Sequence, residues 1–232
     1  MELLVLIGGA ALPSLLLVGW IGWRDRGRPE PFRLISMAVL LGFLGTLPVL
    51  LAGFFVGIPE VLLSASLLRA FWSAFISAAL LEESVKFFII KRFFYHNPAF
   101  DTIMDGILYA MCVSLGFAFA ENILYGMDGT GVLFLRAFTA VPLHASATGI
   151  MGYWLGQAKL GRQRQAAAVL QRKAWISAVL IHGAYNFLLL LGGLAAYAAL
   201  LVLAAAIAIL LKLIKKAQAA DSLHTVLASG SS

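Results

Sequence analysis

Three glutamates and two histidines interrupt otherwise apolar stretches of this 232-residue chain. They are Glu82, Glu83, Glu121, His144 and His182. An ionisable side chain at the centre of a bilayer costs about 2.5 to 3.5 kcal/mol on insertion scales, so it is kept there for a partner or a function. Carboxylates and imidazoles transfer protons in hydrolysis and bind divalent metal ions. We therefore take these five residues as the candidate catalytic set.

The first two glutamates belong to a motif that ends in a lysine. In the run EESVK at 82–86, helical geometry brings Lys86 within about 40° of Glu82 and about 60° of Glu83 around the helix axis. One ammonium group can reach either carboxylate but cannot fully compensate both. At least one glutamate is therefore expected to face another cation or to be hydrogen-bonded in its neutral form. A carboxylate balanced in this way is suited to act as a general base.

The histidines have different surroundings. His182 and Asn186 are four residues apart and share one face of a helix, so the amide can orient the imidazole or a reacting carbonyl. His144 lies near the middle of its apolar stretch, where a histidine commonly hydrogen-bonds to another helix. Asn122 directly follows the third glutamate. We assign supporting roles to Lys86, Asn122 and Asn186.

The charges of this set do not balance. Three glutamates against one lysine leave a net charge of −2 if both histidines are neutral. A divalent metal ion would cancel this charge, and so would protonation of two carboxylates or of both histidines. Histidine nitrogens and glutamate oxygens are ligands of catalytic zinc, whose bound water has a pKa of about 7. The chain has no His-Glu-x-x-His motif, so the sequence leaves metal-assisted and metal-free chemistry open.

Depth in the membrane predicts how these residues pair. Counted at about 1.5 Å per residue from the nearest charged flank, Glu83 and His182 lie about 12 to 14 Å deep. On the same scale Glu121 and His144 lie about 22 to 24 Å deep. We expect His182 to pair with Glu82 or Glu83, and His144 to pair with Glu121.

The elements that must position these residues are membrane-spanning helices. Hydrophobic residues make up 62% of the chain and charged residues only 12%, against about 25% charged residues in a soluble domain, which excludes a water-soluble globule. The apolar runs are continuous rather than alternating, which excludes a transmembrane β-barrel. Seven runs are long enough to span: 3–23, 34–58, 70–90, 103–125, 132–157, 174–192 and 194–211. The sequence predicts an all-α polytopic membrane protein, a bundle of about seven transmembrane helices.

Basic residues mark one side of the bundle. Of the 17 lysines and arginines, 14 follow the first, third, fifth and seventh runs, and the connections around 59–60, 128–129 and 192–193 hold none. The positive-inside rule then places the N-terminus outside and the C-terminus in the cytoplasm. The same rule explains the net charge of +6 without a nucleic-acid partner. Arg136 lies near an outer helix end, where its side chain is expected to reach the membrane interface.

The chain is expected to form one transmembrane domain over 1–216, with its catalytic core at about 70–190, and a flexible polar tail over 217–232. Gly53 with Gly57, and Gly152 with Gly156, form faces of small residues at which helices approach closely. The oligomeric state cannot be read from the chain.

Four motifs resemble those of the PrsW family of intramembrane proteases, which is related to the CAAX-prenyl endopeptidases and Abi proteins. They are EESVK at 82–86, FAFAEN at 117–122, PLHASATGIMGYWLG at 142–156 and HGAYN at 182–186. The motifs occur in the family's order on consecutive expected spans. The resemblance implies hydrolysis of a peptide bond in a membrane-anchored protein such as an anti-sigma factor. This would be the first, ectodomain-side cut of regulated intramembrane proteolysis in a bacterial plasma membrane.

The resemblance also implies roles. Glu82 and Glu83 match the paired glutamates, Glu121 the glutamate of the second motif, and His144 and His182 the two histidines. One of the paired glutamates would activate water as general base, and His182 would polarise the scissile carbonyl. Glu121 and His144 would be hydrogen-bonding partners or, with His182, ligands of a divalent metal, zinc. The related superfamily has a histidine where this chain has Glu121, so the sequence leaves open whether its metal-independent mechanism applies.

Two other functions fit part of the pattern. Buried Glu, His and Lys residues also line ion pathways, so a proton-coupled transporter is the main alternative, and it predicts flux through liposomes without cleavage. No inverted repeat is evident, and an odd number of spans does not divide into equal halves. A purely structural membrane protein predicts that Glu83, Glu121 and His182 can be replaced without loss of function. We carry the protease interpretation forward.

Overall fold

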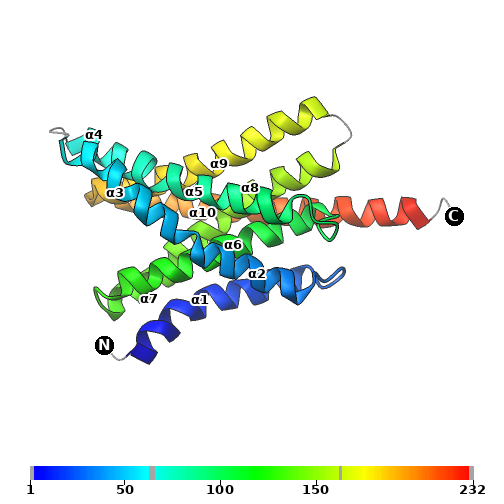
Figure 1. Ribbon diagram of the computed structural model, residues 1–232, viewed down its shortest axis with the longest axis horizontal. Coiled ribbons are helices and arrows are strands. Elements are labelled where there is room, and N and C mark those ends of the chain that lie inside the picture. The colour runs from blue at the N-terminus through cyan, green and yellow to red at the C-terminus, as the bar shows by residue number, and fades with distance from the viewer. Residues whose placement is uncertain (1–2, 63–65, 162–163, 230–232) are drawn as a thin grey trace.

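The computed structural model describes residues 3–62, 66–161 and 164–229, and every regular element in these ranges is a helix. In order they are α1 (Leu3–Arg24), α2 (Phe32–Leu44), α3 (Thr46–Leu62), α4 (Ser66–Phe71), η1 (Trp72–Leu80), α5 (Leu81–Ile89), η2 (Ile90–Phe94), α6 (Ile103–Gly126), α7 (Thr130–Phe138), α8 (Ala140–Leu160), α9 (Arg164–Leu191) and α10 (Gly193–Ser229). The η elements are π-helical. The helices form an elongated bundle with the start of α1 and the end of α10 at opposite ends (Figure 1). The all-α prediction is confirmed.

Five helices of the described part are long and apolar enough to cross a membrane, fewer than the seven predicted. They are Leu3–Arg24, Phe32–Val56, Ile103–Gly126, Ala166–Leu191 and Gly193–Ser222. The predicted span at 70–90 is divided among α4, η1, α5 and η2, and α5 carries three charged side chains. The predicted span at 132–157 is divided between α7 and α8. These two segments carry most of the candidate site, and their polar residues are what lower their hydropathy.

Two boundaries differ from the prediction. Helix α3 continues through Pro59 and Glu60 to Leu62, where a connection was expected. Helix α10 runs to Ser229, so the segment expected to be a flexible tail from residue 217 is helical as far as that residue. The Asp221 carboxylate on α10 accepts hydrogen bonds of 3.0 Å from the backbone N–H groups of Ile103 and Met104 at the start of α6. This contact gives the extended helix a partner in the bundle.

Helix α6 is the centre of the bundle and packs against α1, α2, α8 and α10. In its most apolar 18-residue window, 94% of the residues are buried. Thr102 and Asp105 cap its first turn reciprocally. A Cβ atom on Gly116 would lie 2.0 Å from the carbonyl oxygen of Val39, so only glycine allows α2 this close to α6.

Of the two predicted faces of small residues, one packs closely against another helix, and the other does not do so at Gly53. A Cβ atom on Gly152 would lie 2.2 Å from the carbonyl oxygen of Gly106, and one on Gly156 would lie 2.9 Å from Ile103 Cα. The close approach predicted for this pair is confirmed and joins α8 to α6. A Cβ atom on Gly53 would meet nothing within 4 Å, so the packing role predicted there is wrong. Gly57 lies outside the residues whose side chains are described.

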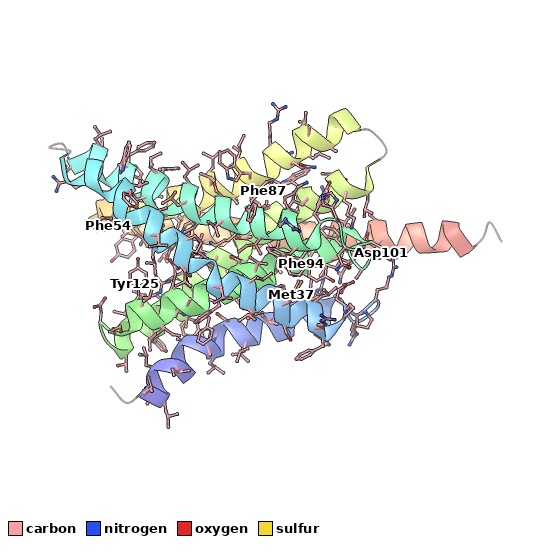
Figure 2. The ribbon with its side chains drawn as sticks, viewed as in Figure 1. Met37, Phe54, Phe87, Phe94, Asp101 and Tyr125 are labelled. Atoms are coloured by element: carbon pink, nitrogen blue, oxygen red, sulfur yellow. The ribbon has the colours of Figure 1, made fainter. Side chains whose placement is uncertain are left out.

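The outer surface of the bundle is apolar. Phe54, with 73% of its surface exposed, projects from α3, and many other side chains project in the same way around the ribbon (Figure 2). Leu51 and Leu194 are 70% and 88% exposed. Apolar exposure on this scale suits contact with lipid, whereas water would make it a site of aggregation. The protein is an integral membrane protein.

Candidate active site

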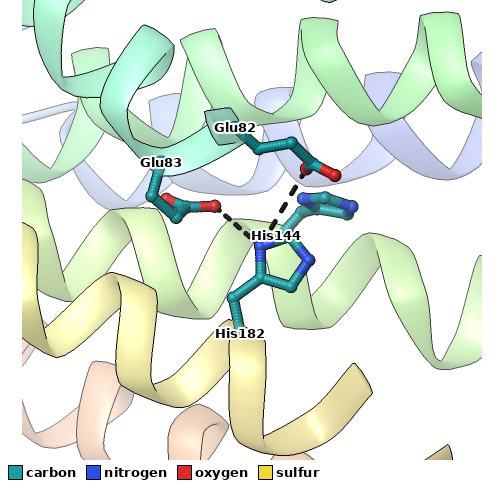
Figure 3. A group of neighbouring side chains, drawn as sticks. All are labelled: Glu82, Glu83, His144 and His182. Atoms are coloured by element: carbon teal, nitrogen blue, oxygen red, sulfur yellow. Dashed lines mark hydrogen bonds and ion pairs between the residues drawn. The ribbon is translucent and has the colours of Figure 1, made fainter. Parts of the chain in front are cut away.

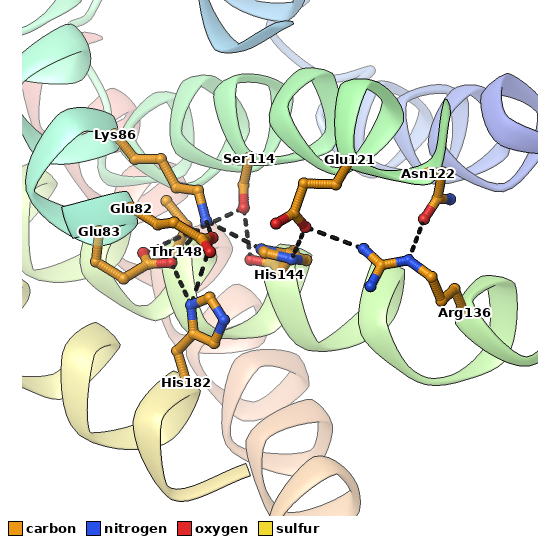
Figure 4. Close-up of polar contacts among 10 residues, drawn as sticks. All are labelled: Glu82, Glu83, Lys86, Ser114, Glu121, Asn122, Arg136, His144, Thr148 and His182. Atoms are coloured by element: carbon orange, nitrogen blue, oxygen red, sulfur yellow. Dashed lines mark hydrogen bonds and ion pairs between the residues drawn. The ribbon is translucent and has the colours of Figure 1, made fainter. Parts of the chain in front are cut away.

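Glu82, Glu83 and Lys86 meet inside the bundle on one face of α5. The helix follows the π-helical turns of η1, and wider turns of this kind are frequent next to functional sites. Lys86 and Glu83 are fully buried, and Glu82 is 5% exposed. Lys86 Nζ lies 2.7 Å from Glu83 Oε1 and 3.3 Å from Glu82 Oε2 (Figure 4). The prediction that one lysine reaches either carboxylate is confirmed, and here it reaches both at once.

The third contact of Lys86 determines the tautomer of His144. Lys86 Nζ lies 3.0 Å from His144 Nδ1, and an ammonium group can only donate. Nδ1 must therefore be an acceptor, so the ring proton of neutral His144 is on Nε2. This Nε2 lies 2.8 Å from Glu121 Oε2, the acceptor that it requires. All three N–H groups of Lys86 thus have acceptors, and the α5 cluster is linked to Glu121 through one imidazole.

Glu83 is held from three sides. Besides Lys86, it faces His182, whose Nδ1 lies 3.0 Å from Glu83 Oε1 (Figure 3). The Thr148 hydroxyl donates a hydrogen bond of 2.9 Å to Glu83 Oε2. The same His182 nitrogen is 3.9 Å from Glu82 Oε2. Glu83 therefore has its two oxygens fully engaged, whereas Glu82 has only one close partner, Lys86.

A second group extends the network toward α7. Arg136 donates a hydrogen bond of 3.0 Å to Glu121 Oε2 and one of 2.7 Å to Asn122 Oδ1 (Figure 4). Only 16% of the Arg136 side chain is exposed. The prediction that Arg136 reaches the membrane interface is therefore wrong, because its guanidinium group compensates the Glu121 carboxylate inside the bundle. Asn122 Nδ2 is buried and has no hydrogen-bond partner.

The predicted pairs are present. His182 contacts Glu83, and His144 contacts Glu121. The two depth levels expected from the sequence are bridged by Lys86 and by the two imidazole rings, whose centres are 4.9 Å apart. All five members of the candidate set are thus in one connected network.

A cavity of about 340 Å³ reaches this network. Its lining includes Glu82, Glu121, Arg136, His144, His182 and Asn186. Asn186 lines the same cavity as His182, in agreement with their predicted position on one helix face. Glu83 and Lys86 are not among the lining residues. Of the paired glutamates, Glu82 is the one that a substrate or a water molecule in the cavity can contact.

Four of the side chains can supply ligands to a metal ion. One donor atom each from Glu82, Glu83, His144 and His182 lies within 4.8 Å of all the others. Two carboxylates and two imidazoles are the donor types of catalytic zinc, so the donor set fits such an ion. Lys86 Nζ is within hydrogen-bonding distance of three of the four residues, so the ammonium group and a metal ion compete for their lone pairs. Glu121, predicted as a ligand, faces Arg136 and His144 instead.

Several contributing residues were missed by sequence reasoning. Arg136 was assigned to the interface, and Thr148 and Ser114 were not singled out at all. Ser114 Oγ donates a hydrogen bond of 2.8 Å to the His144 carbonyl oxygen and lies 2.9 Å from Thr148 Oγ1. Thr148 is four residues after His144, so it shares a helix face with a residue that was predicted, and this spacing was the available signal.

We expect Thr148→Val to lower both stability and activity. The substitution keeps the shape of the side chain but removes the hydroxyl that donates to the buried Glu83 carboxylate. A hydrogen bond to a charged group contributes about 1.5 to 3 kcal/mol, which should appear as a lower midpoint of thermal unfolding in detergent. Thr46→Val is the matched control, because the Thr46 hydroxyl is buried but bonds only to the backbone of Phe43. Equal midpoints for the two variants would contradict the role given to Thr148.

Paired carboxylates and two imidazoles beside a cavity, all inside a lipid-facing helical bundle, are the arrangement expected of a membrane-embedded hydrolase. Residues 30–211 match the model of the PrsW family intramembrane metalloproteases, and the chain belongs to this family. The protein is an intramembrane endopeptidase.

Relatives that carry the name Protease PrsW support this assignment. The protein of Geobacillus kaustophilus is 35% identical over 191 residues, covering 80% of each chain. That of Oceanobacillus iheyensis is 36% identical over 188 residues, covering 81% of this chain and 84% of the relative. That of Bacillus subtilis is 32% identical over 186 residues, covering 79% and 82%. No solved structure gives a significant match.

Proposed function

We propose that Glu82 is the general base that activates water for peptide-bond hydrolysis. The observation that carries this assignment is that Glu82, and not Glu83, lines the cavity together with His182 and Asn186. Glu82 also has the fewer partners of the two, so it has oxygen lone pairs available for a water molecule. Glu83 would act as a positioning residue that holds Lys86, His182 and Thr148 around the base.

The reaction follows from these positions. Glu82 takes a proton from water, and the oxygen attacks the scissile carbonyl carbon. His182 has its Nδ1 at the Glu83 carboxylate, so its Nε2, when protonated, donates a hydrogen bond to the oxyanion. The Asn186 amide provides a second donor. The C–N bond then breaks, and protonated Glu82 returns its proton to the leaving nitrogen, which yields a carboxylic acid and an amine. The acid then transfers its proton to the amine or to water and becomes a carboxylate.

A bound metal ion would assist this reaction, and Glu82 would still be the general base. Glu83, His144 and His182 would hold zinc and leave Glu82 free at the cavity. When bound, such an ion supplies a Lewis acid that lowers the pKa of a coordinated water to about 7. The sequence-based ligand set of Glu121, His144 and His182 stays a prediction. Because Glu121 pairs with Arg136, we favour Glu83 over Glu121 as the carboxylate ligand.

We propose a membrane-anchored protein, such as an anti-sigma factor, as the substrate. The cavity lining includes Tyr125 near the end of α6, Thr139 before α8 and Tyr197 near the start of α10. These positions adjoin the α6–α7 and α9–α10 connections, which hold no basic residues. The α1–α2 connection, the end of α8 and the C-terminal part of α10, in or near which most basic residues occur, lie at the other end (Figure 1).

By the positive-inside rule this arrangement supports an N-terminus outside, a cytoplasmic C-terminus and a site reached from the outer leaflet. A cut on the ectodomain side would follow. The bacterial relatives support a bacterial plasma membrane as the location. The relation to CAAX-prenyl endopeptidases and Abi proteins stays a prediction from the motifs.

The decisive experiment combines a cleavage assay with metal analysis. Purified protein in liposomes is given a single-span substrate labelled on its ectodomain side, with and without chelator. Because the donor set fits zinc and the family is described as metalloproteases, we expect about one metal ion per chain and loss of cleavage on chelation, restored by added zinc. Full activity without bound metal would contradict the metal-assisted scheme, and Glu82 would then act with Lys86 and without a metal ion. Absence of cleavage under every condition would contradict the proposed substrate.

The transporter alternative is not favoured, because the matched relatives carry the name of a protease. The same liposomes provide the test. A pH-sensitive dye inside them should report no proton flux while the substrate is being cut.

A further inference from the structure

A second cluster of carboxylates lies at the other end of the bundle from the cavity. Asp25 follows α1, Glu30 precedes α2, and Asp105 is in the first turn of α6. One carboxylate oxygen from each lies within 4.8 Å of the other two. The nearest residue of the active-site network on α6 is Ser114, nine residues after Asp105, which at 1.5 Å per residue separates the two by about 13 to 14 Å along the helix.

Two of these carboxylates have unsatisfied oxygens. Asp105 is fully buried and Asp25 is 6% exposed. Asp105 Oδ2 accepts hydrogen bonds from the backbone N–H groups of Asp101 and Thr102, but Asp105 Oδ1 has no partner. Asp25 Oδ2 has none either. Buried oxygens of this kind lose their hydration without compensation, which is costly unless a ligand fills the gap.

Among the described residues, these carboxylates also lack a direct ion pair. Within the described part of the chain, no lysine or arginine nitrogen lies within 4.0 Å of the three carboxylates. Arg28 is nearby but pairs with Asp101 at 3.0 Å. Burial, together with the charges of Asp105 and Glu30, raises the pKa of Asp25 to about 8. Burial likewise raises the pKa of Glu30 to about 7, although the Tyr109 hydroxyl donates a hydrogen bond to it.

We propose that Asp25, Glu30 and Asp105 bind a hard divalent cation of the Mg²⁺ type. The donors are all oxygens, which suit Mg²⁺ or Ca²⁺ and not the nitrogen- and sulfur-seeking metals. A cavity of about 480 Å³, lined by Asp25, Arg28, Thr102 and Asp221 among others, reaches the cluster at Asp25 and has room for the water ligands that Mg²⁺ retains.

The cation has a structural consequence. It joins the α1–α2 connection to the first turn of α6, whose backbone N–H groups are also bound by Asp221 of α10. Three segments far apart in the sequence are thereby held at one end of the central helix. Because binding to the folded state alone stabilises it by mass action, Mg²⁺ should raise the midpoint of thermal unfolding.

Mn²⁺ is a suitable probe for this site, since its free ion is counted directly by electron paramagnetic resonance. We expect the full-length protein in detergent to bind Mn²⁺ saturably at this cluster and Mg²⁺ to displace it. Asp25→Asn should weaken this binding by at least about 10-fold, the scale seen when residues around a metal are lost. Asp101→Asn is the matched control, because Asp101 is exposed and paired with Arg28 at the same end.

His182→Ala separates this site from the catalytic one and should leave the Mg²⁺-displaceable Mn²⁺ bound. Size-exclusion profiles establish that each variant is folded, and Glu30→Gln replaces Asp25→Asn if the latter is not. The proposal is overturned if the unaltered protein binds no Mn²⁺ that Mg²⁺ displaces, or if Asp25→Asn binds it as tightly as Asp101→Asn. In that case protons shared between their oxygens, and not a metal ion, would hold the carboxylates of Asp25, Glu30 and Asp105 together.

Discussion

Glu82→Gln should abolish cleavage of a membrane-anchored substrate while leaving the bundle folded. Glutamine keeps the size of the side chain and an acceptor for Lys86 Nζ at 3.3 Å, but it cannot take a proton from water. Loss of a general base lowers the rate by about 10²- to 10⁴-fold. The substitution removes one of two carboxylates that share a single lysine, so the midpoint of thermal unfolding should stay the same or rise. The measurements are the cleavage rate in liposomes and thermal unfolding of the same preparation.

Comparison with Glu83→Gln distinguishes the general base from the residue that positions the groups around it. Glu83 is fully buried and bonded to Lys86, His182 and Thr148, so its substitution should lower the unfolding midpoint as well as the rate. Glu83→Gln should retain some cleavage, and the rate of this cleavage should still vary with pH as it does with an intact general base. Glu82→Gln should show no cleavage from which a pH profile could be measured. Asp128→Asn, in the connection between α6 and α7, is the control. Wild-type cleavage by Glu82→Gln would transfer the role of base to Glu83.

Lys86→Met should be the most destabilising single substitution in the network. Lys86 is fully buried and supplies hydrogen bonds to Glu82, Glu83 and His144. Removing one partner of a buried ion pair leaves an uncompensated charge and costs about 3 to 5 kcal/mol. We expect low yield, a much lower unfolding midpoint and no cleavage. Lys212→Met, at an exposed position on α10, should behave like the unaltered protein in all three respects.

A double substitution tests whether charge is the cause. Replacing a buried pair by neutral groups is far less costly than breaking it, so Lys86→Met combined with Glu83→Gln should be more stable than Lys86→Met alone. Cleavage should not return, because His182 then lacks the carboxylate that orients it. If the double variant is as unstable as the single one, the packing of the lysine stem, rather than its charge, accounts for the loss.

Much of the site could be predicted because the membrane makes buried charges costly. Glu121 and His144 stood out as polar groups in apolar runs, and counting residues along each helix predicted that they would meet. The spacing of Lys86 from Glu82 and Glu83 likewise predicted their contact. These inferences rest on rise and rotation within single helices, which are local properties.

Arg136 shows where such reasoning fails. Its position near a helix end suggested an interface residue, yet its guanidinium group pairs with Glu121. The two predicted spans that are not among the five long apolar helices show a related effect. The segments at 70–90 and 132–157 are apolar on average, but they are interrupted by π-helical turns or by a break between α7 and α8. Where a helix breaks and what its ends contact depend on its neighbours.

By itself the sequence determined the helical membrane fold, the short set of polar residues that form the candidate site, and their pairing by depth. It could do so because hydrophobic transfer and helical periodicity act on each segment separately. Only the tertiary structure decided that Glu82 faces the cavity while Glu83 is enclosed by Lys86, His182 and Thr148. Two adjacent residues point about 100° apart on a helix, and which direction leads to a cavity depends on the helices packed around it. The same holds for Asp25, Glu30 and Asp105, which come together only when α1, α2 and α6 meet at one end of the bundle.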